Sequence, residues 1–171
     1  MCTKPIVLIG LMGAGKTTIG RRLAARLGIP FVDADHEIEL AAGLTISEIF
    51  ERYGEAHFRE GENRVITRLL DGRIKVIATG GGAFMHPETR QNILELSTAI
   101  WINADVSVLA DRVGRRETRP LLKNGNVLDV LKQLAAVRNP VYALAPIHIQ
   151  SQPIHQDLVV DEILKALKAC R

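Results

Sequence analysis

Aromatic residues and cysteines are scarce in this sequence of 171 residues. Phe, Trp and Tyr make up 4% of it, and the two cysteines are Cys2 and Cys170. Nucleic-acid binders usually concentrate basic residues on one face and interleave them with aromatics, so we expect no nucleic-acid partner for this chain of net charge +3. Two cysteines so far apart make no disulfide framework, and we expect two free thiols.

Long apolar runs are absent as well. No stretch approaches the roughly 18 apolar residues of a membrane-spanning helix, which argues against a membrane protein. Lys4 followed by PIVLIGLMGAG is similar to the charged start and short apolar core of a secretion signal. The next stretch, KTTIGRRLAARLG, has a basic helical pattern without a small-residue cleavage site. We therefore expect a cytoplasmic protein.

Short apolar runs alternate with helical patterns along the chain. Strands are predicted at IVLI (6–9), FVDAD (31–35), KVIATGGG (75–82), AIWIN (99–103) and IHIQ (147–150). Helices are predicted at 16–27, 87–96, 106–113, 127–137 and 158–169, with two or three more between 38 and 70, one of them capped by Thr45 or Ser47. Pro140 is expected to disrupt a helix. This alternation indicates an α/β fold with a mostly parallel sheet.

A glycine-rich segment follows the first predicted strand. Residues 10–17, GLMGAGKT, match the phosphate-binding pattern G-x-x-x-x-G-K-[ST], and a helix is predicted directly after them. The glycines allow backbone N–H groups to approach phosphate oxygens closely, the lysine reaches the β- and γ-phosphates, and the hydroxyl binds Mg²⁺. The residues predicted to bind ATP here are Gly13, Ala14, Gly15, Lys16, Thr17 and Thr18.

Other signatures narrow the class of nucleotide-binding protein. The N-K-x-D guanine signature of GTPases does not occur, and the D-x-x-G match at 111–114 falls inside a predicted helix. The run KVIATGGG ends in glycines rather than in the acid expected of a motor ATPase. Asp33 and Asp35 follow the second strand, and in an extended segment they share one side. This placement favours a small-molecule kinase.

The segments GLMGAGKTT, FVDAD, FREGE, TGGG, RPLL and RNPVY occur in that order. With this set the chain resembles the shikimate kinase family over nearly its whole length. The resemblance implies a three-layer α/β sandwich with a five-stranded parallel sheet in the order 2-3-1-4-5. It implies one P-loop kinase domain over 1–171, with an acceptor-binding helical region at about 34–62 and a mobile lid at about 112–126. It also implies transfer of the ATP γ-phosphoryl group to the 3-hydroxyl of shikimate.

The resemblance also assigns roles to residues. Arg59 and Arg138 would clamp the shikimate carboxylate, because a guanidinium forms two parallel hydrogen bonds with it. Asp35 would orient the attacking hydroxyl, with or without acting as its base. The other acceptor-site residues are Phe58, which lines the pocket, Gly80, Gly81 and Gly82, which bind through N–H groups, and Glu62, which holds Arg59 in place.

The remaining roles concern the nucleotide and its metal. Arg119 would descend with the lid onto the phosphates, and Arg112 would pack on the adenine face. Mg²⁺ is the implied cofactor, bound by Thr17 and, through water, by Asp33. Lys16, Asp35 and Arg119 are therefore the predicted catalytic residues of a monomeric enzyme whose partners are ATP and shikimate.

Alternatives remain open for the whole chain and for single residues. The chain would otherwise be another small P-loop kinase, acting on gluconate or a nucleotide, or a non-catalytic nucleotide-binding regulator. Arg59 and Arg138 would otherwise form structural salt bridges, and Arg112 and Glu62 would lie on the surface. Asp33 would only cap a helix, and residues 80–82 would only form a turn.

Overall fold

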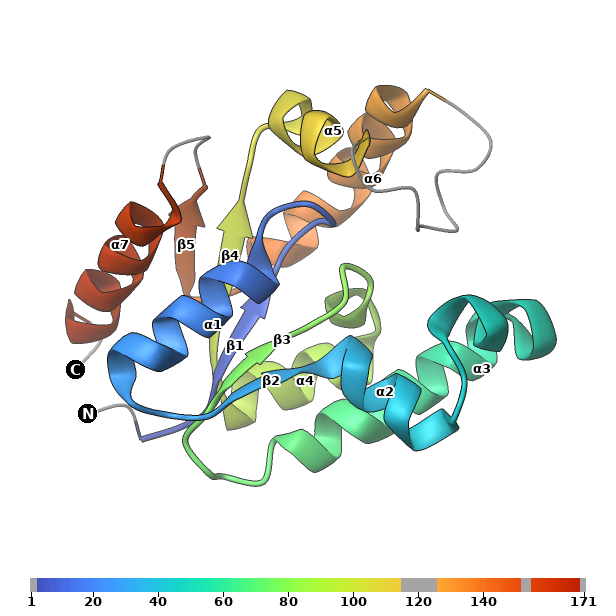
Figure 1. The fold of residues 1–171 in the computed structure, drawn as a ribbon, viewed down its shortest axis with the longest axis horizontal. Helices are drawn as coiled ribbons and strands as arrows, with labels where there is room; N and C mark the ends of the chain where they lie inside the picture. Colours follow the sequence, from blue (N-terminus) through green and yellow to red (C-terminus); the bar gives the residue numbers. More distant parts are fainter. Residues whose placement is uncertain (1–2, 115–125, 152–154, 170–171) are drawn as a thin grey trace.

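The sheet at the centre of the molecule has five parallel strands. The computed structural model describes residues 3–114, 126–151 and 155–169. Its strands are β1 (Ile6–Ile9), β2 (Phe31–Asp33), β3 (Val76–Ala78), β4 (Thr98–Asn103) and β5 (Ile147–Gln150). They are hydrogen-bonded in the order β2-β3-β1-β4-β5 (Figure 1). The predicted fold class and strand order are confirmed.

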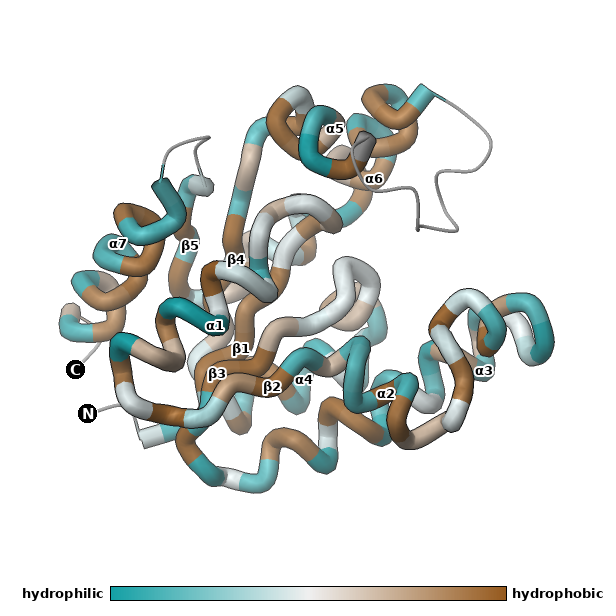
Figure 2. The backbone as a smooth tube through the Cα atoms, viewed as in Figure 1, coloured by the Kyte–Doolittle hydropathy of each residue, from teal (hydrophilic) through white to brown (hydrophobic). Residues whose placement is uncertain are grey.

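The innermost strand, β1, is the most apolar. All of its residues are buried, and Leu8 pairs with Ala78 of β3 on one side and with Ile100 of β4 on the other. Such uninterrupted apolar strands occur where helices cover both faces of a parallel sheet. Figure 2 shows mostly brown, hydrophobic strands at the centre and helices with a mixture of brown and teal residues around them. The edge strand β5 instead alternates buried and exposed residues.

Helices enclose the sheet and extend from its carboxyl edge. They are α1 (Lys16–Leu27), α2 (Ala34–Ala42), α3 (Ile46–Leu69), α4 (Pro87–Leu96), α5 (Val106–Gly114), α6 (Val127–Tyr142) and α7 (Gln156–Ala169), with a short 3₁₀ turn, η1 (Ala83–Met85). α1 and α7 pack together in front of the sheet and α4 lies behind it, which gives three layers (Figure 1). Within the described ranges, no helix has the length and apolarity needed to cross a membrane.

Local signals place most helix ends where they are predicted. Gly28 ends α1 with a left-handed φ of 66°, and Thr45 forms a capping box with Glu48 at the start of α3. Gly54 has a φ of 81° and ψ of 174°, so α3 is kinked there into two helical segments. The two helices predicted on either side of this glycine are therefore present.

Two local predictions are wrong. Asp35 does not lie in an extended segment, because β2 ends at Asp33 and α2 begins at Ala34; the Asp33 carboxylate caps α2 by accepting the Asp35 N–H at 3.1 Å. Pro140 does not disrupt α6, which continues to Tyr142 and includes the proline. Tyr142 is fully buried, and its tertiary packing outweighs the intrinsic cost of the proline.

Candidate active site

The loop between β1 and α1 has a backbone that only glycine supports without strain. Gly10, Gly13 and Gly15 have φ values of 140°, 80° and 92°. A Cβ at Gly13 would lie 2.8 Å from Cγ2 of Val113, so a side chain is excluded there by space as well. This loop ends at the N-terminus of α1, where free N–H groups and the helix dipole favour a bound phosphate.

Lys16 begins α1 and is buried at the bottom of this loop. Its Nζ donates to the carbonyl oxygens of Gly10 at 2.7 Å and Leu11 at 2.8 Å. The ammonium group is thereby held across the loop, beneath the cavity that the loop surrounds. A cation in this position complements the charge of phosphate groups in the cavity.

Thr17 and Asp33 connect the loop with the end of β2. The Thr17 hydroxyl donates to Oδ2 of Asp33 at 2.9 Å, and both residues line the same cavity as Lys16. Hydroxyl and carboxylate oxygens are ligands that Mg²⁺ accepts. Among the described residues no group of three or more His, Cys, Asp or Glu could hold a metal ion. The residues present thus fit a magnesium ion whose other ligands are phosphate oxygens and water.

The cavity at this loop has a volume of about 400 Å³ and a polar lining. Arg112 of α5 reaches it, and its Nη1 donates to the carbonyl oxygens of Gly13 at 3.2 Å and Ala14 at 3.4 Å. Gln156 also lines the cavity, although no role is predicted for it from the sequence. It stands at the first position of α7, beyond the carboxyl end of β5, where ligand sites of such sheets lie. We refer to this cavity as the donor cavity.

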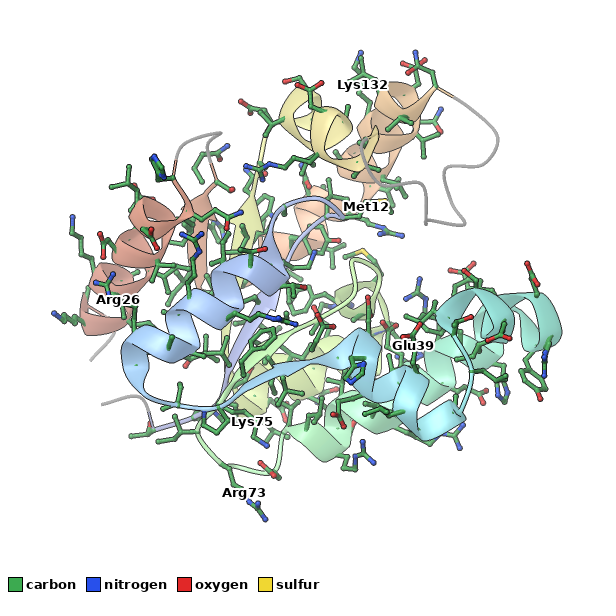
Figure 3. The ribbon with its side chains drawn as sticks, in the orientation of Figure 1. Met12, Arg26, Glu39, Arg73, Lys75 and Lys132 are labelled. Carbon is green, nitrogen blue, oxygen red and sulfur yellow. The ribbon has the colours of Figure 1, made fainter. Side chains whose placement is uncertain are left out.

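A second cavity, of about 750 Å³, adjoins the first. It is bordered by the loop after β1, by α2, α3 and α6, and by the glycine loop after β3. Figure 3 shows Met12 on the first of these elements and Glu39 on α2, and both line the cavity. Asp35, Gly80 and Gly81 line both cavities, so the two meet at these residues. We refer to the second as the acceptor cavity.

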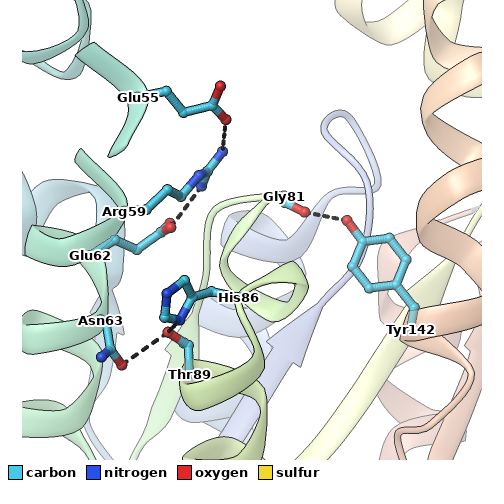
Figure 4. A network of polar contacts seen from close by, with 8 residues as sticks. All are labelled: Glu55, Arg59, Glu62, Asn63, Gly81, His86, Thr89 and Tyr142. Atoms are coloured by element: carbon cyan, nitrogen blue, oxygen red, sulfur yellow. Dashed lines mark hydrogen bonds and ion pairs between the residues drawn. The ribbon is translucent and has the colours of Figure 1, made fainter. Parts of the chain in front are cut away.

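Arg59 is held on one side of the acceptor cavity by carboxylates of its own helix (Figure 4). Its Nη1 lies 2.7 Å from Oε2 of Glu62, and its Nη2 lies 3.4 Å from Oε1 of Glu55. The guanidinium also stands 5.0 Å from the centre of the Phe58 ring, which adds a cation–π contact. The predicted contact between Glu62 and Arg59 is present. Together these contacts fix the direction in which Arg59 faces the cavity.

Glu62 is the most deeply buried acid of the site, with 1% of its surface exposed. It is therefore not the surface acid considered as an alternative. Burial raises the pKa of its carboxyl, while the charges of Arg59 and, less strongly, Arg138 oppose this shift. Oε1 of Glu62 has no hydrogen-bond partner among the described residues. The carboxylate thus keeps one acceptor oxygen beside the acceptor cavity.

The glycine loop at 80–82 is packed tightly against charged side chains. A Cβ at Gly80 would lie 2.8 Å from Oδ1 of Asp35, and a Cβ at Gly81 would lie 3.4 Å from Nη1 of Arg138. A Cβ at Gly82 would overlap the Arg59 guanidinium. Side chains at Gly80 and Gly82 would displace the charged groups, and the loop as it stands provides only backbone to the cavity.

The structure brings nearly all of the predicted site residues to the carboxyl edge of the sheet. Thr18 lines the donor cavity, and Phe58 lines the acceptor cavity together with Arg59, Glu62 and Arg138. Arg119 and residues 115–125 of the predicted lid lie outside the described residues. Tyr142, which belongs to the RNPVY segment but has no predicted role, donates a hydrogen bond to the carbonyl oxygen of Gly81.

Comparison with known proteins gives one family. The family model described as "Shikimate kinase" matches residues 12–168. The chain is 56% identical to a shikimate kinase of Rhodopseudomonas palustris, with 96% of this chain and 81% of that protein covered. It is 54% identical to one of Bradyrhizobium diazoefficiens, with 97% and 80% covered.

A solved structure agrees with the sequence relatives. Shikimate kinase from Acinetobacter baumannii in complex with shikimate superimposes with a TM-score of 0.93 at 36% identity, covering 98% of this chain and 94% of that one. The donor cavity with its glycine loop, the adjoining acceptor cavity with two half-buried arginines, and these relatives lead to one conclusion. The chain belongs to the shikimate kinase family.

Proposed function

We propose that this chain transfers the γ-phosphoryl group of ATP to the 3-hydroxyl of shikimate, giving shikimate 3-phosphate and ADP. The observation that carries the proposal is the junction of the two cavities at Asp35 and Gly80–Gly81. A phosphate held at the loop after β1 and a hydroxyl held beside Asp35 would meet at this junction. The family supplies the expected donor and acceptor.

Arg59 and Arg138 would bind the acceptor's carboxylate. They come from α3 and α6 and line the same cavity from different elements. Two guanidinium groups that converge on one carboxylate bind it in one orientation, because each forms parallel hydrogen bonds in a fixed plane. This orientation turns the hydroxyl-bearing ring toward Asp35.

Asp35 would orient the attacking hydroxyl by accepting a hydrogen bond from it. Phosphoryl transfer has a loose transition state that needs little help from a strong base, so we propose positioning as the main contribution of this carboxylate. Lys16 would stabilise the charge on the transferring group. Mg²⁺, held by Thr17 and through water by Asp33, would neutralise phosphate charge when it is bound.

The other predictions from the sequence remain proposals of the same kind. Arg112 would pack on the adenine, and Arg119 would reach the phosphates from a lid at about 112–126 that excludes water as a competing acceptor. We propose one domain over 1–171, with the acceptor-binding helical region at about 34–62. We further propose a monomer that acts in the cytoplasm.

The test is ADP release from Mg-ATP with shikimate, quinate, gluconate or a nucleoside monophosphate supplied separately. We expect turnover with shikimate alone and its loss in Asp35→Asn, which keeps the size of the side chain but removes its charge. Turnover with gluconate or a nucleotide instead would refute the proposed acceptor. Tight ATP binding without transfer to any acceptor would refute the proposed enzyme and favour a regulator.

A further inference from the structure

Tyr142 is a buried residue at the end of α6 whose ring and hydroxyl have separate contacts. The side chain has 0% of its surface exposed, and its ring centre lies 6.0 Å from that of Trp101 and 6.4 Å from that of Phe84. The ring therefore belongs to the hydrophobic core. The hydroxyl leaves this core and donates a hydrogen bond to the carbonyl oxygen of Gly81 (Figure 4).

Gly81 lies where the donor and acceptor cavities meet. Its ideal Cβ position is 3.4 Å from the backbone nitrogen of Met12 in the loop after β1, and 3.4 Å from Nη1 of Arg138. The glycine whose carbonyl Tyr142 holds therefore faces both the backbone of the donor side and a guanidinium of the acceptor side. A small rotation of this peptide would change the spacing between the two sides.

The Tyr142 hydroxyl can donate to the Gly81 carbonyl over the whole pH range in which the enzyme would work. Burial raises the pKa of Tyr142 to about 12, although the nearby Arg138 acts in the opposite direction. The phenol thus keeps its proton and remains a donor at neutral and moderately alkaline pH. Without it, the half-buried Gly81 carbonyl would lose its side-chain donor, which costs free energy.

We propose that the Tyr142 hydroxyl is a positioning group of the active site, which fixes the Gly81 peptide and thereby sets the spacing between bound nucleotide and bound acceptor. The inference rests on the proposed function for its catalytic consequence. Tyr142 lines neither cavity, so its hydroxyl would act through the glycine loop. Arg138, which lies near the Tyr142 hydroxyl, is one helical turn earlier on α6. The C-terminal end of α6 would therefore position two parts of the acceptor site, the Arg138 guanidinium and the glycine loop.

The test is Tyr142→Phe, which removes the hydroxyl and keeps the ring in the core. We expect kcat/KM for shikimate to fall about tenfold, chiefly through KM, because one partly buried hydrogen bond is lost at the site. KM for ATP should change much less. Amide hydrogen exchange should become faster in residues 80–85, where the N–H groups of Ala83 and Met85 donate to the carbonyls of Gly80 and Gly82.

Two control variants separate positioning from stability. Tyr53→Phe makes the same chemical change at an exposed residue of α3, and we expect no effect on either KM. Ile163→Val removes one methylene from the buried face of α7, so it should lower the melting temperature without changing KM or exchange in residues 80–85. A Tyr142→Phe enzyme that is only less stable, with both KM values and the exchange unchanged, would overturn the proposal.

A second route does not depend on how well Tyr142→Phe folds. The chain has two tyrosines, so a Tyr53→Phe background leaves Tyr142 as the only position for biosynthetic fluorotyrosine. Multiple fluorination lowers the pKa of a phenol far enough to bring loss of the Tyr142 proton into the working pH range, and we expect KM for shikimate to rise there in the labelled enzyme only. An unchanged pH profile would contradict the proposal. If the enzyme transfers nothing to shikimate, the proposed function fails, while exchange in residues 80–85 still decides the role of Tyr142.

Discussion

The donor and acceptor cavities share an edge but are built differently. The donor cavity has one continuous segment at its base, whose glycines, Lys16 and Thr17 line it together with residues of several other elements. The acceptor cavity takes single side chains from α2, α3 and α6, as well as a glycine loop. A local loop at a helix N-terminus therefore distinguishes the first cavity, whereas the charged groups of the second come from separate elements.

This difference sets how each cavity tolerates change. A backbone cradle keeps its donors after most side-chain substitutions, so within the loop the glycines, Lys16 and the proposed metal ligand Thr17 are the sensitive positions. A cavity of side chains depends on each guanidinium and carboxylate, and on the partners that orient them. Variants of the donor side should therefore alter turnover, whereas variants of the acceptor side should alter affinity for one substrate.

The largest effect is expected for Lys16→Met. Loss of the cation at the phosphates should lower kcat by about 10²-fold to 10³-fold, comparable to removal of one key transition-state hydrogen-bond donor. Shikimate binding in the absence of ATP, measured by calorimetry, should stay close to that of the parent enzyme. A large loss of shikimate binding would show that a change in the donor cavity alters the acceptor cavity, which contradicts the independence of the two.

Arg138→Lys tests the acceptor side. The ammonium group cannot form two parallel hydrogen bonds, so KM for shikimate should rise about tenfold to a hundredfold, the cost of one to two charged hydrogen bonds. KM for ATP should remain within about a factor of two, since a uniform binding contact to one substrate is lost. Steady-state kinetics with each substrate varied in turn checks this. Equal rises in both KM values would indicate a structural salt bridge instead.

Glu62 gives the acceptor side a dependence on pH. Its pKa is raised above the ordinary value of 4.5 by burial, so it takes up a proton at a higher pH than an exposed glutamate. When it does, Arg59 loses the charge of its closest partner. KM for shikimate should therefore rise as the pH falls through this range, and Glu62→Gln should show the raised KM without that step.

The free energy of unfolding should also depend on the protonation of Glu62. A low pH, which weakens shikimate binding, should favour the folded state. A carboxyl whose folded pKa is raised favours the folded state most below its unfolded pKa, and this contribution is lost as the pH rises through the folded pKa. The free energy of unfolding of the parent, relative to Glu62→Gln, should thus decrease with rising pH. Urea titrations of both proteins at several pH values check this. A constant difference would contradict the raised pKa.

The smallest effect is expected for Arg26→Ala on the donor side. Arg26 of α1, labelled in Figure 3, pairs with Asp161 of α7 at 2.9 Å, but both side chains are about half exposed, at 52% and 43%. Exposed ion pairs of this kind contribute about 0–1 kcal/mol. The melting temperature should shift slightly, more at low salt than at high salt, and both KM values should stay unchanged. A change in KM for ATP would show that the packing of α7 against α1 shapes the donor cavity.

The contrast between the cavities also explains what could be predicted from the sequence. The phosphate loop is contiguous, and its position between a strand and a helix could be inferred from local patterns alone. The strand order and the acceptor residues Arg59 and Arg138 were predicted through family resemblance, because residues so distant in the chain have no local pattern that places them together. The contact of Glu62 with Arg59 was predictable, since residues three apart are neighbours on a helix.

The residues that sequence reasoning missed depend on tertiary packing. Helix α6 continues past Pro140 because Tyr142 is buried between Trp101 and Phe84. Gln156 lines the donor cavity only because α7 packs against α1. Asp35 was placed in a strand, whereas the neighbouring Asp33 acts as a cap and starts a helix one residue earlier. The first two contacts have no local pattern, whereas the cap at Asp33 has one, because Asp is a preferred residue at helix N-termini.

The central position of β1 has a consequence for the growing chain during synthesis. Ile6 pairs with Val76 of β3 and with Thr98 of β4, so both neighbours of this apolar strand are translated long after it. Contacts so distant in the sequence delay folding. Until they form, β1 offers unpaired backbone and an uncovered apolar surface that other chains or chaperones can bind. The loop after β1 packs against Ile102 and Val113. A nascent chain can therefore form its nucleotide-binding loop only after the ribosome has translated both residues.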